Sequence, residues 1–144
     1  MKVSDILKTK GSAVITVRRD ETVLDLSEKL RQERIGAAIV SMDGHTIDGI
    51  VSERDVAYAV AAHASRLPTV LVETIMTKVV VVCAPDDTVN EVMSVMTKQR
   101  FRHLPVQDGQ KLVGIISIGD VMTHRLSEVQ LEADVLRDSA RVPR

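Results

Sequence analysis

Residues 49–55 read Gly-Ile-Val-Ser-Glu-Arg-Asp, and residues 114–120 read Gly-Ile-Ile-Ser-Ile-Gly-Asp. In each segment an apolar run typical of a strand leads to a serine that can begin a helix, with an aspartate three residues later. The two segments lie 65 positions apart, so the same strand-to-helix junction occurs twice. This duplication predicts two copies of one structural unit.

The similarity extends from these junctions toward the N-terminus. Residues 3–7 match residues 72–76 at a shift of 69, and residues 20–23 match residues 86–89 at a shift of 66. The shift changes because the first copy has three extra residues before its first strand and one more in its later turn. Insertions of this kind fall in loops, where they are tolerated best.

The order of elements within each copy follows from local patterns. Thr22 and Thr88 each precede an apolar pattern of helical period and have an acidic residue three positions later, which predicts a capping box. Residues 35–40 and 101–106 then read as strands, each followed by an Asp-Gly turn and a second strand. Each copy is therefore predicted to run short helix, strand, helix, strand, tight turn, strand, helix.

The composition restricts the class of protein. The chain has 144 residues and is 44% hydrophobic, but it has no Trp, one Phe and one Tyr, so an aliphatic core is expected. The net charge of −1 gives no basic surface for nucleic acid. The lone Cys83 lies in an apolar run and is interpreted as a buried hydrophobe. With no long apolar segment or signal-like N-terminus, we expect a cytoplasmic protein that does not associate with membranes.

The duplicated junction also suggests chemistry. A serine at a helix N-cap and an aspartate three residues later place a hydroxyl and a carboxylate beside the free amides of the first turn. The carboxylate can accept hydrogen bonds from both ribose hydroxyls, while the hydroxyl and amides suit a phosphate. The alternative is a capping box that only begins a helix.

Taken together, the paired Asp-x-Thr-Val segments, the hairpins and the Gly-Ile-x-Ser-x-x-Asp junctions resemble the tandem CBS domain family, in its small free-standing bacterial form. The resemblance covers residues 3–56 and 72–121. It implies an α+β fold of two βαββα-type repeats packed about a pseudo-twofold axis, with a C-terminal helix. We assign residues 1–69 to the first repeat with its leading helix and loop, 70–125 to the second, and 126–144 to a C-terminal helix and tail.

The resemblance further implies clefts that bind AMP, ATP, NAD(H) or S-adenosylmethionine, with AMP the first candidate. Asp55 and Asp120 would hold ribose hydroxyls, and Ser52 and Ser117 would hold ribose or phosphate. The full set of candidate binding residues is Thr16, Val17, Gly36, Ala37, Ser52, Arg54, Asp55, Val82, Cys83, Arg102, His103, Pro105, Ser117, Ile118 and Asp120. Among these, the residues that would frame the adenine are Thr16, Val17, Val82 and Cys83.

The two copies differ at positions that bear on phosphate binding. Arg102 and His103 stand where the first copy has Gly36 and Ala37, which supplies cationic and hydrogen-bonding groups. The first copy instead has an arginine within its junction, where the second has a glycine. From these differences we expect unequal clefts, with the second copy's junction binding more strongly.

Catalysis and metal binding find no support in the motifs. The four histidines have no paired metal-ligand spacing, and no nucleophile elbow, dinucleotide fingerprint or phosphate-binding loop occurs. We therefore expect no enzyme activity, no catalytic residue and no metal. A ligand-independent interaction scaffold remains the main alternative, and a small nucleotide hydrolase or transferase a weaker one.

The C-terminal segment carries apolar residues at helical spacing, which form one seam: Met122, Leu126, Val129, Ala133 and Leu136. The seam could pack on the chain's own core or on a second chain. Because the resemblance implies discs that pair through their helices, we expect a homodimer that acts on an unidentified regulated protein.

Overall fold

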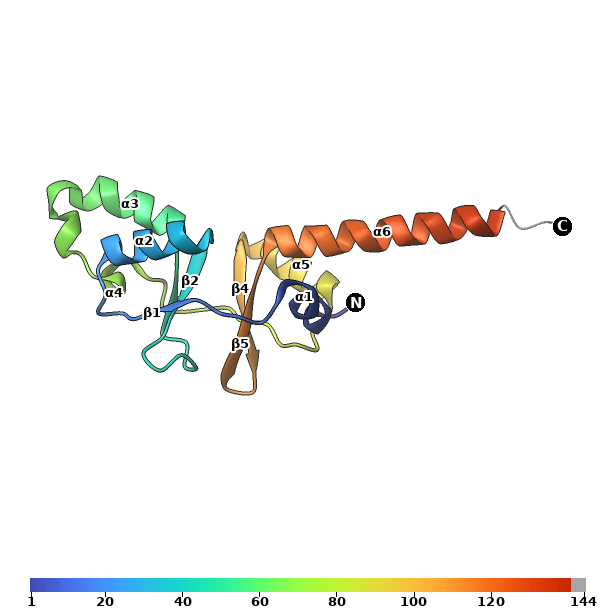
Figure 1. Cartoon of the computed structure of the whole chain (residues 1–144), viewed down its shortest axis with the longest axis horizontal. Helices are drawn as coiled ribbons and strands as arrows, with labels where there is room; N and C mark the ends of the chain where they lie inside the picture. Colours follow the sequence, from blue (N-terminus) through green and yellow to red (C-terminus); the bar gives the residue numbers. More distant parts are fainter. Residues whose placement is uncertain (141–144) are drawn as a thin grey trace.

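The first repeat is a three-stranded sheet covered by two helices (Figure 1). The computed structural model describes residues 1–140. The elements of the first repeat are β1 (Thr16–Val17), α2 (Val23–Glu33), β2 (Ala37–Val40), β3 (Gly49–Ser52), α3 (Glu53–His63) and the 3₁₀ turn η1 (Ala64–Thr69). β1 is parallel to β2, and β3 is antiparallel to it.

The second repeat has the same order of elements around a two-stranded sheet. Its elements are α5 (Val89–Gln99), β4 (His103–Asp108), β5 (Lys111–Ser117) and α6 (Ile118–Ala140). The first strand expected in the run 79–84 is reduced to one parallel bridge, between Cys83 and Val106. Only Cys83 keeps both backbone bonds to β4, and Pro85, which has no amide hydrogen to donate, follows shortly after.

The predicted capping boxes are confirmed at both amphipathic helices. The Thr22 side chain accepts a hydrogen bond from the amide of Asp25, and the Asp25 carboxylate accepts one from the amide of Thr22. Thr88 and Glu91 form the same pair at the start of α5. Local sequence therefore determines where these two helices begin.

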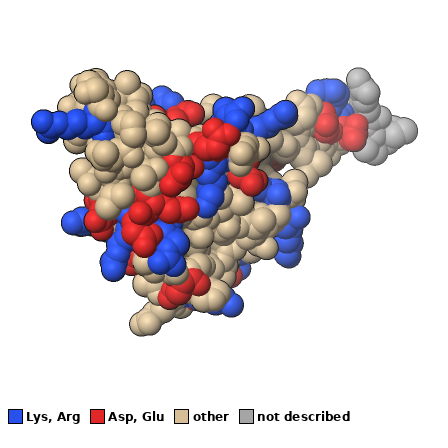
Figure 2. Space-filling model, turned by 60° about the vertical axis from the view of Figure 1, so that its left-hand side comes forward, with Lys and Arg blue, Asp and Glu red and all other residues tan. Residues whose placement is uncertain are grey.

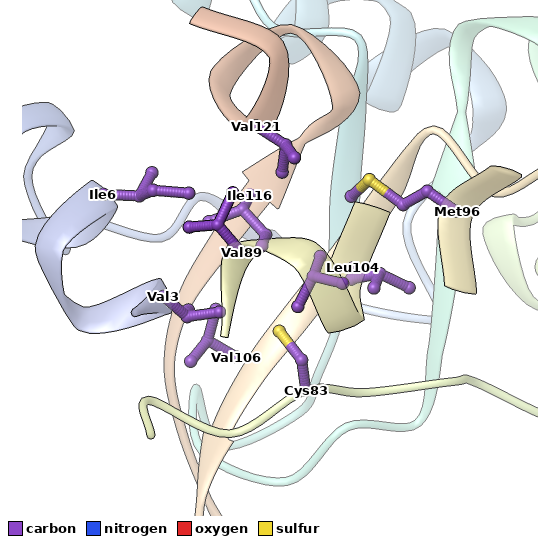
Figure 3. Close-up of a cluster of buried hydrophobic side chains, with 10 residues drawn as sticks. Val3, Ile6, Cys83, Val89, Met96, Leu104, Val106, Ile116 and Val121 are labelled. Atoms are coloured by element: carbon purple, nitrogen blue, oxygen red, sulfur yellow. The ribbon is translucent and has the colours of Figure 1, made fainter. Parts of the chain in front are cut away.

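Two short helices precede the repeats, and each packs on the other copy. They are α1 (Val3–Lys10) and α4 (Val72–Ile75), called here the leader helices. Val3 and Ile6 of α1 are buried in the core of the second repeat (Figure 3). Val72 of α4 is buried in the core of the first. Each leader helix therefore packs on the repeat that it does not directly precede in the sequence.

Backbone hydrogen bonds hold the leader helices in these crossed positions. The amide of Val3 donates to the carbonyl of Asp87 at 2.9 Å, and the amide of Val72 donates to the carbonyl of Glu21 at 2.8 Å. The assignment of residues 1–69 to one repeat thus follows the sequence order, whereas its leading helix packs in the core of the second repeat.

Two glycines let the leader helices approach the sheets closely. A Cβ atom on Gly49 would lie 2.8 Å from the carbonyl oxygen of Thr77, and one on Gly114 would lie 2.8 Å from Cδ2 of Leu7. Both glycines stand at equivalent places, three residues before the junction serines. The close approach brings the chain just after α4 to the first copy's junction and the end of α1 to the second copy's junction.

Helix α6 extends away from the body of the protein (Figure 1). It runs without a break through the boundary that we placed between residues 125 and 126. The seam is not covered by the chain's own core, because Met122, Leu126 and Leu136 are 52%, 67% and 71% exposed. Residues 141–144, which belong to the predicted tail, lie outside the described residues.

On the face seen in Figure 2, basic and acidic side chains are interspersed, so this face carries no large patch of one charge sign. Such a surface does not favour electrostatic binding to a phosphate backbone on this face. Within residues 1–140, no helix is both long and apolar enough to cross a bilayer.

Candidate functional site

The first strand-to-helix junction forms a polar corner made by Ser52 and Asp55, called here the first corner. Oδ2 of Asp55 accepts hydrogen bonds from the amide and the hydroxyl of Ser52, at 2.8 and 3.1 Å. The amide of Asp55 in turn lies 3.4 Å from Oγ of Ser52. The junction thus caps helix α3, as the simpler interpretation predicts, while Oδ1 of Asp55 accepts no hydrogen bond from residues 1–140.

A cavity of about 290 Å³ opens beside the first corner. Its walls come from both repeats and from the segment that follows the leader helix α4. The lining residues are Gly36, Ala37, Ile50, Ser52, Glu53, Arg54, Asp55, Thr77, Val79, Val80, Val81, Arg100, Phe101, Arg102, His103 and Leu104. Aliphatic side chains therefore form one wall, and charged side chains another.

The charged wall carries more cations than anions. Arg54, Arg100 and Arg102 line it, against the carboxylates of Glu53 and Asp55. Guanidinium groups form paired hydrogen bonds with phosphate oxygens. The cavity thus combines a carboxylate suited to hydroxyl groups with arginines suited to an anion.

His103 lies where the two repeats meet, at the start of β4. Its burial, together with the nearby charge of Lys10, lowers the pKa of the imidazole, although Asp120 and Glu53 act in the opposite direction. The depressed pKa favours the neutral ring near pH 7, which can donate or accept a hydrogen bond.

The second junction has the same capping geometry, but a lysine side chain is bound to its aspartate. The Ser117 amide donates to Oδ2 of Asp120 at 2.8 Å, and the Asp120 amide donates to Oγ of Ser117 at 3.1 Å. Nζ of Lys10, the last residue of α1, lies 2.6 Å from the same Asp120 oxygen. Burial opposes ionisation of Asp120, but hydrogen bonds from Lys10 and Ser117 outweigh it, so its pKa is lowered. We call Ser117 and Asp120 the second corner.

Of the predicted binding residues, the structure brings seven to the cavity. These are Gly36, Ala37, Ser52, Arg54, Asp55, Arg102 and His103. Arg102 and His103 therefore lie beside the first copy's junction as well as their own, where His103 pairs with Ser117 across the sheet. Our expectation that they strengthen the second copy's cleft stays a prediction, because the start of β4 borders both junctions.

Other predicted residues lie away from the cavity. Ser117, Ile118 and Asp120 belong to the second junction, where the Ile118 amide donates to the carbonyl of Arg102 at 2.8 Å. Thr16 lies in β1, and its carbonyl oxygen accepts a hydrogen bond from Lys29. Pro105 is a buried residue of β4.

The residues expected to frame adenine also differ from those that line the cavity. Val17 and Cys83 are buried in the two cores, and burial raises the pKa of the Cys83 thiol to about 12. Val82 is exposed and does not line the cavity. The preceding residues 79–81 supply aliphatic side chains to the cavity in their place, because Cys83 already pairs with β4.

Several lining residues were not anticipated. Arg100 ends α5 in a left-handed conformation with φ of 59°, and Phe101 follows it at the edge of the cavity. The repeat pairs Arg100 with Arg34, which ends α2 in the same left-handed conformation, and this match marks the position as a helix end in both copies. Aligning the two copies does not reveal that Arg100 and Phe101 lie at the first copy's junction, because the alignment compares only equivalent positions.

No group of three or more potential metal ligands occurs within the part of the chain that the structure describes.

The fold and the site define a class: two copies of one α/β unit, crossed through their leader helices, with a cavity where the copies meet. The family model for the CBS domain matches residues 3–62 and 72–127. The chain therefore belongs to the CBS domain family and carries two CBS domains in tandem.

Relatives with known sequences agree with this assignment. A mitochondrial CBS domain-containing protein of Arabidopsis thaliana is 30% identical over 83% of this chain and 62% of its own length. A CBS domain-containing protein of Bacillus subtilis is 26% identical over 87% of this chain and 88% of its own. This chain thus spans less than two thirds of the first relative, and about a quarter of two longer Arabidopsis thaliana proteins.

Solved structures have the same fold. The CBS-domain containing protein ATU1752 of Agrobacterium tumefaciens superposes with a TM-score of 0.82 at 40% identity, covering 87% of this chain and 99% of that one. The CBS domain pair of protein MJ0100, crystallised with 5-methylthioadenosine and S-adenosyl-L-methionine, gives a TM-score of 0.77 at 25% identity, covering 89% and 98%.

Proposed function

We propose that this chain is a regulatory module that binds an adenosine nucleotide in the cavity beside the first corner. AMP is the first candidate, with ATP and NAD(H) as alternatives. The observation that carries the proposal is that one cavity holds three arginines and an Asp55 carboxylate whose Oδ1 accepts no hydrogen bond within residues 1–140. The carboxylate can accept hydrogen bonds from ribose hydroxyls, and the arginines can bind a phosphate.

The size and walls of the cavity support a mononucleotide. Ligand pockets usually have volumes of about 300–1,000 Å³, and the cavity of about 290 Å³ lies at the lower end. The aliphatic side chains of residues 79–81 offer an apolar surface for a purine ring. A dinucleotide would have to extend beyond the cavity toward solvent.

The ligands of a structural neighbour support the adenosine class. The MJ0100 domain pair was crystallised with 5-methylthioadenosine and S-adenosyl-L-methionine, two adenosine compounds without phosphate. Here Arg54, Arg100 and Arg102 favour an anion over the cationic sulfonium of S-adenosylmethionine. We therefore place AMP ahead of the sulfonium ligand.

We further propose that ligand binding alters the relative position of the two repeats, and that a partner protein responds. The cavity is lined by both repeats, so a ligand that touches both favours one arrangement through its differential affinity. The exposed seam of α6 supports a homodimer. We propose no catalytic role, since the site offers a capped carboxylate and arginines but no activated nucleophile. The proposed location is the cytoplasm.

The test is isothermal titration calorimetry on nucleotide-free protein with AMP, ATP, NADH and S-adenosylmethionine. We expect AMP to bind and S-adenosylmethionine to bind at least tenfold more weakly. Asp55→Ala should abolish AMP binding. Lack of binding by all four compounds at millimolar concentration would leave the interaction scaffold as the better interpretation.

The matched control is Asp25→Ala. Asp25 occupies the same capping position in α2 that Asp55 occupies in α3, but it does not line the cavity. Both variants lose a capping box, so both should lose similar stability, typically about 1 kcal/mol. Only Asp55→Ala should lose AMP. Equal loss of AMP binding in the two variants would assign the effect to general destabilisation.

A further inference from the structure

The second corner already has a cation bound to it. Nζ of Lys10 donates to Oδ2 of Asp120 at 2.6 Å and to the carbonyl oxygen of Ile115 at 2.8 Å. The Lys10 side chain is 34% exposed and that of Asp120 25%, so the pair is partly shielded from water. Within residues 1–140, no cation forms an ion pair with Asp55 at the first corner.

The difference arises from one position of the repeat. At the shift that aligns Val3 with Val72, Lys10 aligns with Val79, which lines the cavity at the first corner and is 85% exposed. The equivalent of Ile115, Ile50, has its carbonyl bonded by the amide of Thr77 rather than by a side chain. The same stretch of chain thus gives an apolar wall at one corner and an ammonium group at the other.

The length of the leader helices places the ammonium group there. Helix α1 has eight residues and ends at Lys10, whereas α4 has four and ends at Ile75. The chain after α4 runs in an open conformation along the cavity, while α1 continues for another turn toward Asp120. The three extra residues of the first copy lie in the same stretch, between the matched residues 3–7 and β1, so the longer helix and the insertion occur together.

We infer that Lys10 fills the second corner in place of a ribose, so that the chain binds one nucleotide rather than two. This inference rests on the proposed function of the first corner. The charge of the Asp120 carboxylate that would accept ribose hydroxyls is balanced by the ammonium group of Lys10, which occupies its Oδ2. A ribose that hydrogen-bonds Oδ2 of Asp120 would have to displace a charge-assisted hydrogen bond from a partly buried site.

The sequence similarity of the two junctions therefore does not give two equal sites. The second corner keeps its capping bonds, which are independent of Lys10. The lysine links the end of α1 to the start of α6, two elements that otherwise meet through the core of the second repeat. It acts as an internal ligand of the second corner.

The experiment compares the stoichiometry of AMP binding by calorimetry in the wild type and in Lys10→Val, which introduces the residue of the other copy. We expect one AMP per chain for the wild type and two for the variant. Two per chain in the wild type, or one in both proteins, would overturn the inference while leaving the proposed function intact. No binding to either protein would overturn both.

Two further variants keep the test decisive. Lys8→Val changes a neighbouring exposed lysine of α1 that has no ion pair within the described residues, and it should retain one AMP per chain. Lys10→Ala repeats the change with a better helix former, in case valine disturbs the end of α1. Both Lys10 variants should bind two AMP, and thermal unfolding should verify that each is folded. One AMP per chain in a folded Lys10→Ala protein would also overturn the inference.

Discussion

His103 lies against Gly36 across the boundary between the two repeats: a Cβ atom on Gly36 would lie 3.4 Å from both Cε1 and Nε2 of the imidazole. This contact joins the residue before β2 to the first residue of β4, and both residues line the cavity. The cavity therefore depends on a glycine in one copy and a histidine in the other.

Gly36→Val should weaken AMP binding at least tenfold. Alanine would only touch the imidazole, but the two methyl groups of valine must either displace His103 or enter the cavity. Gly36 does not have a positive φ, so the backbone itself accepts valine. Calorimetry measures the affinity, and Gly36→Ala serves as the control. Unchanged AMP affinity in Gly36→Val would show that the ligand does not use this part of the cavity.

His103→Gln should make stability less dependent on pH near neutrality. Burial and Lys10 lower the pKa of His103 below its ordinary value of 6.5, with Arg102 adding to the effect and Asp120 and Glu53 opposing it. Between the folded and unfolded pKa values, only the unfolded chain holds the proton. The free energy of unfolding therefore falls as the pH drops through 6.5.

Urea unfolding at pH 7.5 and pH 5.5 checks this prediction. The wild type should lose more stability than His103→Gln over this range, because all other titrating groups are shared. An equal loss in the two proteins would mean that His103 titrates alike in the folded and unfolded chain.

Gly49→Ala should destabilise the protein more than Gly114→Ala. The new Cβ of Gly49→Ala meets the backbone oxygen of Thr77 at 2.8 Å, which can move only with the chain after α4. In Gly114→Ala the atom at 2.8 Å is the end of the Leu7 side chain, which can change rotamer. Overpacking of this kind costs about 1–3 kcal/mol. Urea unfolding should rank the two variants, and the reverse order would contradict the packing of the leader helices.

Leu126→Glu should convert the proposed homodimer to a monomer. Leu126 lies on the exposed seam of α6, where a buried charge in a helix interface would be strongly unfavourable. Leu131 is similarly exposed, 64% against 67%, but lies off the seam, so Leu131→Glu is a matched control. Light scattering coupled to gel filtration measures the mass. A dimer that survives Leu126→Glu would place the interface elsewhere.

Local patterns were sufficient to predict the repeat, the order of its elements and the capped helix starts. Thr22 with Asp25, and Ser52 with Asp55, form their hydrogen bonds between residues three positions apart, so neighbouring sequence is enough to specify them. The family was predicted from these motifs, and the CBS family model confirms it.

The composition of the cavity could be predicted only in part, since seven of its lining residues were among the predicted ones and the others were not. The prediction that Val82 and Cys83 frame adenine assumed that the expected first strand reaches the site, whereas Cys83 is fixed to β4 and residues 79–81 line the cavity. The position of α6 was likewise left open by its pattern, since an apolar seam indicates a contact but not its partner.

The sequence by itself determined that two similar corners exist, because a serine and an aspartate three residues apart form the same local hydrogen bonds wherever a helix begins. Only the tertiary structure decided what lies beside each corner. Each leader helix packs into the other copy's core, so Val79 comes to Asp55 and Lys10 comes to Asp120. The physical reason is that the burial of Val3, Ile6 and Val72 fixes these neighbours over distances in the chain that no local pattern spans.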